Sequence, residues 1–156
     1  SAKKVGAKFD RYLQEKGQNG TVKFDHKERT LRLVCQTDNY DANTLCSDVK
    51  QLSGGERSFA TLCLLLALGH VIDTPFRILD EYDVFMDENV RRITLNQIKD
   101  HALDVEHRGK QFIIITPNNL KGVVTNQEVI IHRMKPPIRE LATGPRQQTI
   151  ASSSSV

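Results

Sequence analysis

A short apolar run that ends in two adjacent carboxylates constrains the fold of this chain more than any other feature. Residues 76–79 are FRIL, and Asp80 and Glu81 follow directly. In open α/β sheets, ligands bind outside the carboxyl ends of the strands. The pattern therefore predicts a buried strand whose acidic end lies at the edge of a sheet. An exposed acidic turn after a strand would have the same sequence, and the run alone does not separate the two interpretations.

Two glycines open the helix that is predicted before this strand. Residues 52–57 are LSGGER, and an apolar helical pattern continues to about residue 71. Glycines let a ligand approach the backbone closely, and a helix N-terminus attracts anions such as phosphate. Ser53 and Glu56 also fit a capping box, which stabilises a helix start without any ligand. Both interpretations can hold at once.

The remaining elements are predicted from hydrophobic spacing and turn residues. Helices are expected at residues 3–16 and 87–106, strands at 111–116 and 128–132, a β-hairpin at 21–25 and 30–35, and a polar loop at 38–50. Short apolar strands that alternate with helices predict an α/β fold with a mostly parallel sheet, flanked by helices on both faces.

Length and composition fit one globular domain without a membrane segment. The chain has 156 residues, of which 38% are hydrophobic and 26% charged, and its net charge of +3 permits contact with DNA without requiring it. The longest apolar run, residues 59–68, is shorter than the roughly 20 residues that cross a bilayer, so a buried helix is expected. His70, His101 and His107 do not share a helix face with carboxylates at metal-ligand spacing, so no metal site is predicted on them.

Taken together, the motifs resemble those of ABC-type ATPases. Residues 52–56 resemble the signature motif, residues 78–81 a Walker B strand, and residues 86–87 the D-loop. The glutamate and arginine at the end of the first motif, where many ABC ATPases have glutamine, are similar to the structural maintenance of chromosomes (SMC) proteins. Residues 76–87 resemble the sixth member of that family, and the resemblance extends over about residues 9–134.

This resemblance implies that the chain is the C-terminal lobe of an ABC-type ATPase head, whose two halves come from distant parts of a longer polypeptide. Residues 1–16 would end a returning coiled coil, residues 17–140 would form the head lobe, and residues 141–156 would be a disordered tail. The chain contains no G-x-x-x-x-G-K-[ST] phosphate-binding loop, which the N-terminal half would supply. The fragment alone is therefore expected to be inactive.

The functional residues of the family can be placed on the matching positions. The resemblance implies that Asp80 orients Mg²⁺, through water, and that Glu81 is the catalytic base of ATP hydrolysis. It also implies that Ser53 and the backbone of Gly54 and Gly55 contact the γ-phosphate of ATP held by the opposite head. Asp87 would act across the same interface between the two heads. ATP would thus join two heads, and its hydrolysis would release them.

The resemblance also implies partners and a location. The expected partners are the chain's own N-terminal half, the fifth SMC protein as the opposite head, a kleisin with other non-SMC subunits, and DNA, in a nuclear complex for chromosome maintenance and DNA repair. No switch histidine follows Thr116 and Pro117, which departs from the pattern of many ABC ATPases. An alternative function is therefore an ATP-gated module that binds DNA and docks subunits, with little turnover of its own.

Overall fold

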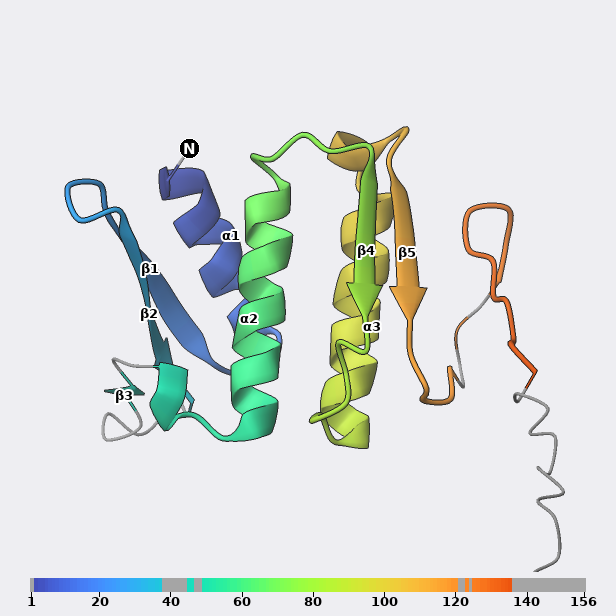
Figure 1. Cartoon of the computed structure of the whole chain (residues 1–156), viewed down its shortest axis with the longest axis horizontal. Helices are drawn as coiled ribbons and strands as arrows, with labels where there is room; N and C mark the ends of the chain where they lie inside the picture. The colour runs from blue at the N-terminus through green and yellow to red at the C-terminus, as the bar shows by residue number, and fades with distance from the viewer. Residues whose placement is uncertain (1, 38–44, 47–48, 121–122, 124, 136–156) are drawn as a thin grey trace, which may run out of the picture. The chain divides into compact units, whose positions relative to one another are not determined.

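The structure is a computed structural model that describes residues 2–37, 45–46, 49–120, 123 and 125–135. It divides into two compact units, Ser1–Val123 and Val124–Val156. The first unit contains the helices and strands of the described residues (Figure 1). The expected disordered tail, residues 141–156, lies outside the described residues.

The N-terminal part of the first unit is a helix against an antiparallel sheet. Helix α1 (Ala2–Gln14) precedes strands β1 (Asn19–Asp25), β2 (Thr30–Gln36) and β3 (Leu45–Cys46), which form one sheet in the order β1-β2-β3. Val22 lies opposite Leu33 in the hairpin, and both side chains are buried. The predicted helix and hairpin are thus confirmed, while the predicted polar loop contains the short strand β3 and the 3₁₀ helix η2 (Val49–Gln51).

The central part is a β-α-β arrangement that follows a long helix. Helix α2 (Gly54–Gly69) leads to strand β4 (Phe76–Asp80), and helix α3 (Glu88–Leu103) with the 3₁₀ helix η3 (Val105–His107) leads to strand β5 (Gln111–Ile115). The two strands are parallel, in register from Phe76 opposite Gln111 to Asp80 opposite Ile115. The limits of all four predicted elements are confirmed to within a few residues.

Alternation along β4 and β5 gives this pair one packed face and one open face. Leu79 and Ile114 pack against the hydrophobic core, whose most deeply buried members include Phe9, Phe59 and Ile98. On the other face the large apolar side chains are exposed: Phe76, Ile78, Ile113 and Ile115. The expectation of a sheet covered on both faces is therefore wrong for the described residues, because no element among them packs on that side.

The expected strand at residues 128–132 is wrong. Those residues form no strand, because a side chain fixes a turn where they begin. The carboxamide oxygen of Asn126 accepts hydrogen bonds from the backbone N–H groups of Glu128 and Val129, each at 2.8 Å. No helix of the described residues is long and apolar enough to cross a membrane.

Candidate functional site

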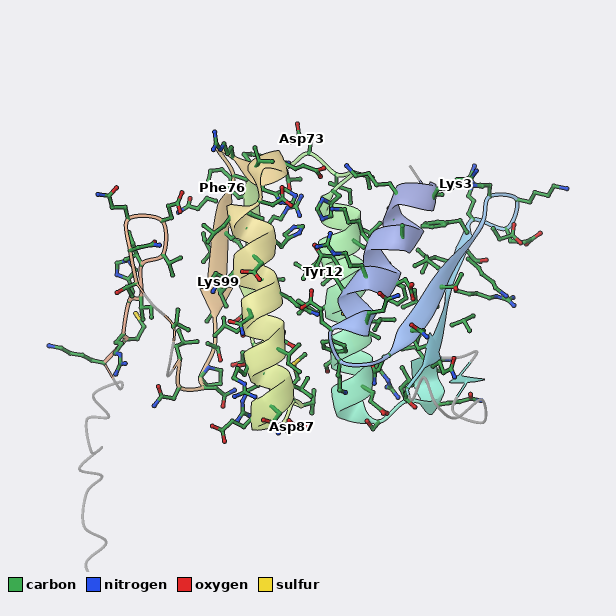
Figure 2. The ribbon with its side chains drawn as sticks, turned by 180° about the vertical axis from the view of Figure 1, so that it is seen from behind. Lys3, Tyr12, Asp73, Phe76, Asp87 and Lys99 are labelled. Carbon is green, nitrogen blue, oxygen red and sulfur yellow. The ribbon has the colours of Figure 1, made fainter. Side chains whose placement is uncertain are left out.

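The residues that the sequence singles out gather at one end of the first unit. Figure 1 shows that α2 and α3 begin at the end of this unit where β4 and β5 finish. Ser53 caps α2, Asp87 caps α3, and Asp80 ends β4 with Glu81 directly after it. Figure 2 labels Asp87 at the start of α3 and Phe76 at the opposite end of the unit. The side chains of Ser53, Asp80, Glu81 and Asp87 are all exposed. We call these four residues the motif end.

The start of α2 is a complete capping box. Ser53 Oγ accepts a hydrogen bond from Glu56 N at 3.3 Å, and Glu56 Oε2 accepts one from Ser53 N at 3.0 Å. The box satisfies the N–H of Glu56, whereas the first N–H groups of a helix have no partner within the helix. The first turn of α2, from Gly54, therefore keeps donors that can receive an anion. The cap is thus confirmed, and it leaves room for the anion site, which stays a prediction.

Gly55 brings the start of α2 against the loop that follows β4. A Cβ built on Gly55 would lie 2.8 Å from the carbonyl oxygen of Phe85, closer than real Cβ atoms come to backbone. A Cβ on Gly54 would lie 3.9 Å from Phe85 Cβ. The second glycine is thus required for this approach, and it joins the two sequence motifs in space.

Glu81 has a backbone conformation that few residues adopt. Its φ is 47°, in the left-handed region, where a side chain costs conformational energy. The N–H of Glu81 donates to the carbonyl oxygen of Ile115 at 2.9 Å, which continues the β4–β5 pairing by one residue and holds the turn. Such outliers concentrate at functional sites. The turn places Glu81 just beyond Asp80, whose carboxylate lies at the exposed end of the strand.

Asp87 has a structural role as a helix cap, and because its side chain is exposed it can have a second role. One carboxylate oxygen, Oδ1, accepts the N–H of Val90 at 2.9 Å and caps α3. Arg91 Nη1 donates to the carbonyl oxygen of Met86 at 2.9 Å, which fixes the residue before the cap. The cap uses one oxygen, so the other can meet a group from outside the chain.

Sequence reasoning missed a partly buried pair, Asp83 and Thr116, that ties together the ends of β4 and β5. Thr116 Oγ1 donates to the Asp83 carboxylate, at 2.7 Å from Oδ2 and 3.0 Å from Oδ1, and Asp83 is 2% exposed. Thr116 Oγ1 in turn accepts from Asn118 N at 3.0 Å. Burial, and then the Asp83 carboxylate, raises the pKa of Tyr82. The only sequence signal for this pair was a second aspartate soon after the acidic strand end.

The structure also brings together three histidines that the sequence kept apart. The ring centroids of His70, His101 and His107 lie 4.0 to 4.9 Å from one another, and their closest ligand nitrogens lie within 4.8 Å of one another. We call these three residues the histidine cluster. Spacing along one helix could not reveal it, because His70 follows α2, His101 lies on α3 and His107 lies on η3.

Hydrogen bonds close the histidine cluster against a metal. Five of the six ring nitrogens have a partner; His107 Nδ1, for example, donates to the carbonyl oxygen of His101 at 2.6 Å. Only His107 Nε2 is buried without one in the described part of the chain. The Arg77 guanidinium lies 3.1 Å from His101 Nε2, where its positive charge opposes a metal cation. The three histidines therefore form part of a hydrogen-bonded network that the sequence analysis did not predict.

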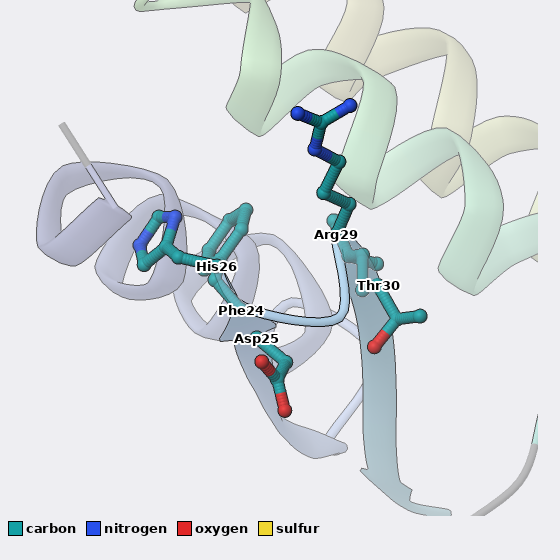
Figure 3. Close-up of a pocket in the computed structure, with 6 residues that line it drawn as sticks. Phe24, Asp25, His26, Arg29 and Thr30 are labelled. Carbon is teal, nitrogen blue, oxygen red and sulfur yellow. The ribbon is translucent and has the colours of Figure 1, made fainter.

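A shallow pocket lies at the tip of the β1–β2 hairpin (Figure 3). It is lined by Phe24, Asp25, His26, Arg29, Thr30 and Leu31. Asp25 Oδ1 accepts the N–H groups of Lys27 and Glu28, each at 3.0 Å. These bonds account for the turn, and the pocket contains none of the predicted site residues.

No protein-family model matches the chain. Structural maintenance of chromosomes protein 6 of Dictyostelium discoideum is 39% identical over 135 residues, 84% of this chain and 11% of the relative. The protein of that name from Homo sapiens is 38% identical over 137 residues, 88% of this chain and 12% of the relative. The chain belongs to the SMC family. It spans 11–12% of the length of these two relatives.

Solved SMC heads have the same fold. An SMC head bound to the C-winged helix domain of ScpA matches with a TM-score of 0.62 at 19% identity, over 76% of this chain and 36% of that one. A structure from work on ATP-driven dimerization and DNA-stimulated activation of SMC ATPases matches with a TM-score of 0.61 at 18% identity, over 81% of this chain and 80% of that one. The predicted fold class, an α/β lobe of an ABC-type ATPase head with a parallel sheet and a small β-hairpin, is confirmed; the parallel sheet of the described residues is the β4–β5 pair.

Proposed function

We propose that this segment is the C-terminal half of an SMC ATPase head, and that it completes a composite ATP site in a complex for chromosome maintenance and DNA repair. One observation carries the proposal. An SMC-head fold brings the starts of α2 and α3 and the end of β4 to one end of the unit, where Ser53, Asp80, Glu81 and Asp87 are exposed. By itself the segment would not turn over ATP, because its sequence has no phosphate-binding loop.

The acidic end of β4 suits metal and water chemistry. Mg²⁺ prefers oxygen ligands and keeps several waters, and Asp80 offers an exposed carboxylate at the strand end. A bound Mg²⁺ would neutralise charge on the phosphates during transfer. Glu81, one residue further and held by the bond from its N–H to Ile115, would accept a proton from the attacking water.

The start of α2 suits the phosphate of a nucleotide held by the opposite head. Ser53 and the backbone of Gly54 and Gly55 would contact the γ-phosphate, supported by the positive end of the helix dipole. Asp87, exposed at the start of α3, would act across the same interface. Two heads would then close around ATP and separate after hydrolysis.

The open face of the β4–β5 pair suits the missing N-terminal half. Phe76 and Ile78 are 61% and 62% exposed, and a face this apolar in a protein is normally covered by another element. We therefore place the N-terminal half of the head, with its phosphate-binding loop, against this face. A related head binds the C-winged helix domain of ScpA, which supports a subunit of that kind as a further partner. The fifth SMC protein as the opposite head and DNA as the bound polymer are further parts of this proposal.

Substitution of Glu81 tests the function. In the full-length chain that carries this segment, assembled with its partner head, Glu81→Gln should slow ATP hydrolysis roughly 10²–10⁴-fold, because a general base contributes about that much. ATP-dependent head association should persist. Glu88→Gln, which removes an exposed carboxylate from the first turn of α3, is the matched control and should hydrolyse ATP normally. Turnover by Glu81→Gln at the wild-type rate would refute the proposed function.

A further inference from the structure

Arg77 is a β4 side chain that contacts three other elements. Its Nη2 donates to the carbonyl oxygens of Gly69 and, at 2.9 Å, Ile72, where α2 ends. Its Nη1 donates to His101 Nε2 on α3 at 3.1 Å. The guanidinium carbon also lies 5.5 Å from the ring centroid of Phe112 on β5. One cation thus fixes the position of β4 relative to the end of α2.

Gly69 makes room for this guanidinium. A Cβ on Gly69 would overlap Arg77 Nη1 and would lie 3.0 Å from His101 Nε2. The last residue of α2 therefore has no side chain where the arginine enters. Burial lowers the pKa of Arg77 from its usual value, yet arginine remains protonated in proteins.

The bonds beyond Arg77 run in one direction. Arginine only donates and an ionised glutamate only accepts, so the two ends assign the protons between them. His101 accepts at Nε2 from Arg77 and donates from Nδ1 to Tyr12 Oη at 2.8 Å. Tyr12 donates to His70 Nε2 at 3.0 Å, and His70 donates from Nδ1 to Glu106 at 2.8 Å. The chain of bonds connects β4 to α1 through the histidine cluster.

We propose that Arg77 is a positioning residue that couples the two half-sites of the head, and that Tyr12 extends this coupling to α1. The inference rests on the proposed function. Arg77 lies on the strand that ends at Asp80 and Glu81, and it binds the end of the helix that begins after Ser53. It therefore connects the carboxylates that act on one nucleotide with the turn that acts on the nucleotide of the opposite head.

The lengths of the elements make this coupling effective. Helix α2 has 16 residues and is about 24 Å long, so a shift at its far end moves its first turn as a rigid rod. The strand reaches its acidic end only a few residues after Arg77. Misplacement of catalytic groups by about 1 Å can cost about 10²-fold in rate. A side chain that sets the register of α2 against β4 therefore controls hydrolysis without touching the nucleotide.

Arg77→Lys tests the coupling in the full-length chain assembled with its partner head. Lysine keeps the charge, but a single ammonium group cannot hold two carbonyl oxygens and an imidazole in one plane. We expect kcat to fall about tenfold while the affinity for ATP changes less than about twofold, because no contact to nucleotide is lost. Arg92→Lys, at an exposed position on α3, is the matched control and should behave as wild type.

Tyr12→Phe provides an independent variant, because it removes only the hydroxyl that joins His101 to His70. It should also lower kcat with unchanged ATP affinity, and in the double variant the two effects should not add, as expected for one network. Wild-type kcat in both variants, or a loss of ATP affinity as large as the loss of kcat, overturns the proposal. If Arg77→Lys does not assemble, Tyr12→Phe decides alone by the same criteria. Glu81→Gln separates the two hypotheses: if it blocks hydrolysis while these variants do not, only the positioning role fails.

Discussion

The two ends of α2 differ in how complete they are. Where the helix finishes, Arg77, His70 and His101 are joined by hydrogen bonds to groups of this same chain. Where it begins, Ser53, Asp80, Glu81 and Asp87 are exposed, and a strained backbone at Glu81 holds a carboxylate toward solvent. Where α2 finishes, the polar groups are satisfied by other groups of this chain, and we call this end the closed end. Where α2 begins, the exposed groups are available to a ligand or a partner.

This contrast separates stability from function within one small unit. Polar groups buried without partners are costly, so breaking one of the hydrogen bonds that join Arg77, His101, Tyr12 and His70 is expected to lower stability. At the motif end, substitution of the exposed carboxylates Asp80 and Glu81 should change the free energy of unfolding by less than about 0.5 kcal/mol. Ser53 and Asp87 also cap helices, and loss of either cap should cost about 1 kcal/mol. Substitutions at the closed end should therefore mainly lower the free energy of unfolding. Substitutions at the motif end should mainly change binding or turnover.

The largest loss of stability is expected from Gly69→Ala. The new Cβ would overlap the Arg77 guanidinium and force it away from the carbonyl oxygens and from His101. Loss of these bonds from a partly buried charge should lower the free energy of unfolding by about 3 kcal/mol, measured by denaturant titration. Gly6→Ala is the control, since a Cβ there meets nothing within 4 Å and alanine favours a helix by up to about 1 kcal/mol. Equal stability of Gly69→Ala and wild type would mean that the end of α2 is not closed by Arg77.

Ile78→Ser should affect association and leave the chain itself intact. Ile78 is 62% exposed on the open face of the β4–β5 pair, so its loss should change the unfolding free energy by less than about 0.5 kcal/mol. If the N-terminal half covers this face, burial of an isoleucine contributes about 1.5–3 kcal/mol, and its loss weakens association roughly 10–100-fold. Binding of the separately expressed N-terminal half, measured by calorimetry, checks this. Leu31→Ser, at an exposed leucine of the hairpin, should bind normally. Equal affinity for both variants would place the N-terminal half elsewhere.

The same contrast explains what sequence alone could predict. Local patterns predict the motif end: the capping box of Ser53 and Glu56, the apolar strand before Asp80 and the helix that starts at Asp87 all depend on neighbours a few residues away. The roles of these residues with nucleotide and metal remain predictions. The exposure of one face of the β4–β5 pair could not be predicted, because a buried and an exposed apolar strand have the same composition.

The closed end could not be predicted, because its contacts join residues far apart in the chain. Arg77 binds a carbonyl at the end of α2, a histidine on α3 and, through that histidine, Tyr12 on α1. No periodicity along one element identifies such partners. The failed strand at residues 128–132 has a different cause, because Asn126 fixes a turn with its side chain where hydrophobic alternation favours a strand.

The smallest effect, and the sharpest probe of the closed end, is the pH dependence of stability. Burial, followed by the nearby His107, His70 and Arg77, lowers the pKa of His101 to about 3, from about 6.5 in an unfolded chain. Burial also lowers the pKa of His70. The unfolded state then binds more protons, so stability is fully present above about pH 6.5 and falls as the pH drops toward 3, by at most about 1.4 kcal/mol per pH unit for each histidine.

Denaturant titrations between about pH 5 and 6.5 isolate this contribution from that of carboxylates, which begin to titrate below that range. The hydrogen bond from His70, and then that from Lys4, lowers the pKa of Glu106 to about 2. Glu106 therefore titrates with the carboxylates, below this pH range. His101→Gln should flatten the dependence, because an amide can accept from Arg77 and donate to Tyr12 without titrating. His26→Gln, at an exposed position of the hairpin, should leave it unchanged. An unchanged slope in His101→Gln would show that the titration of His101 does not cause the pH dependence of stability.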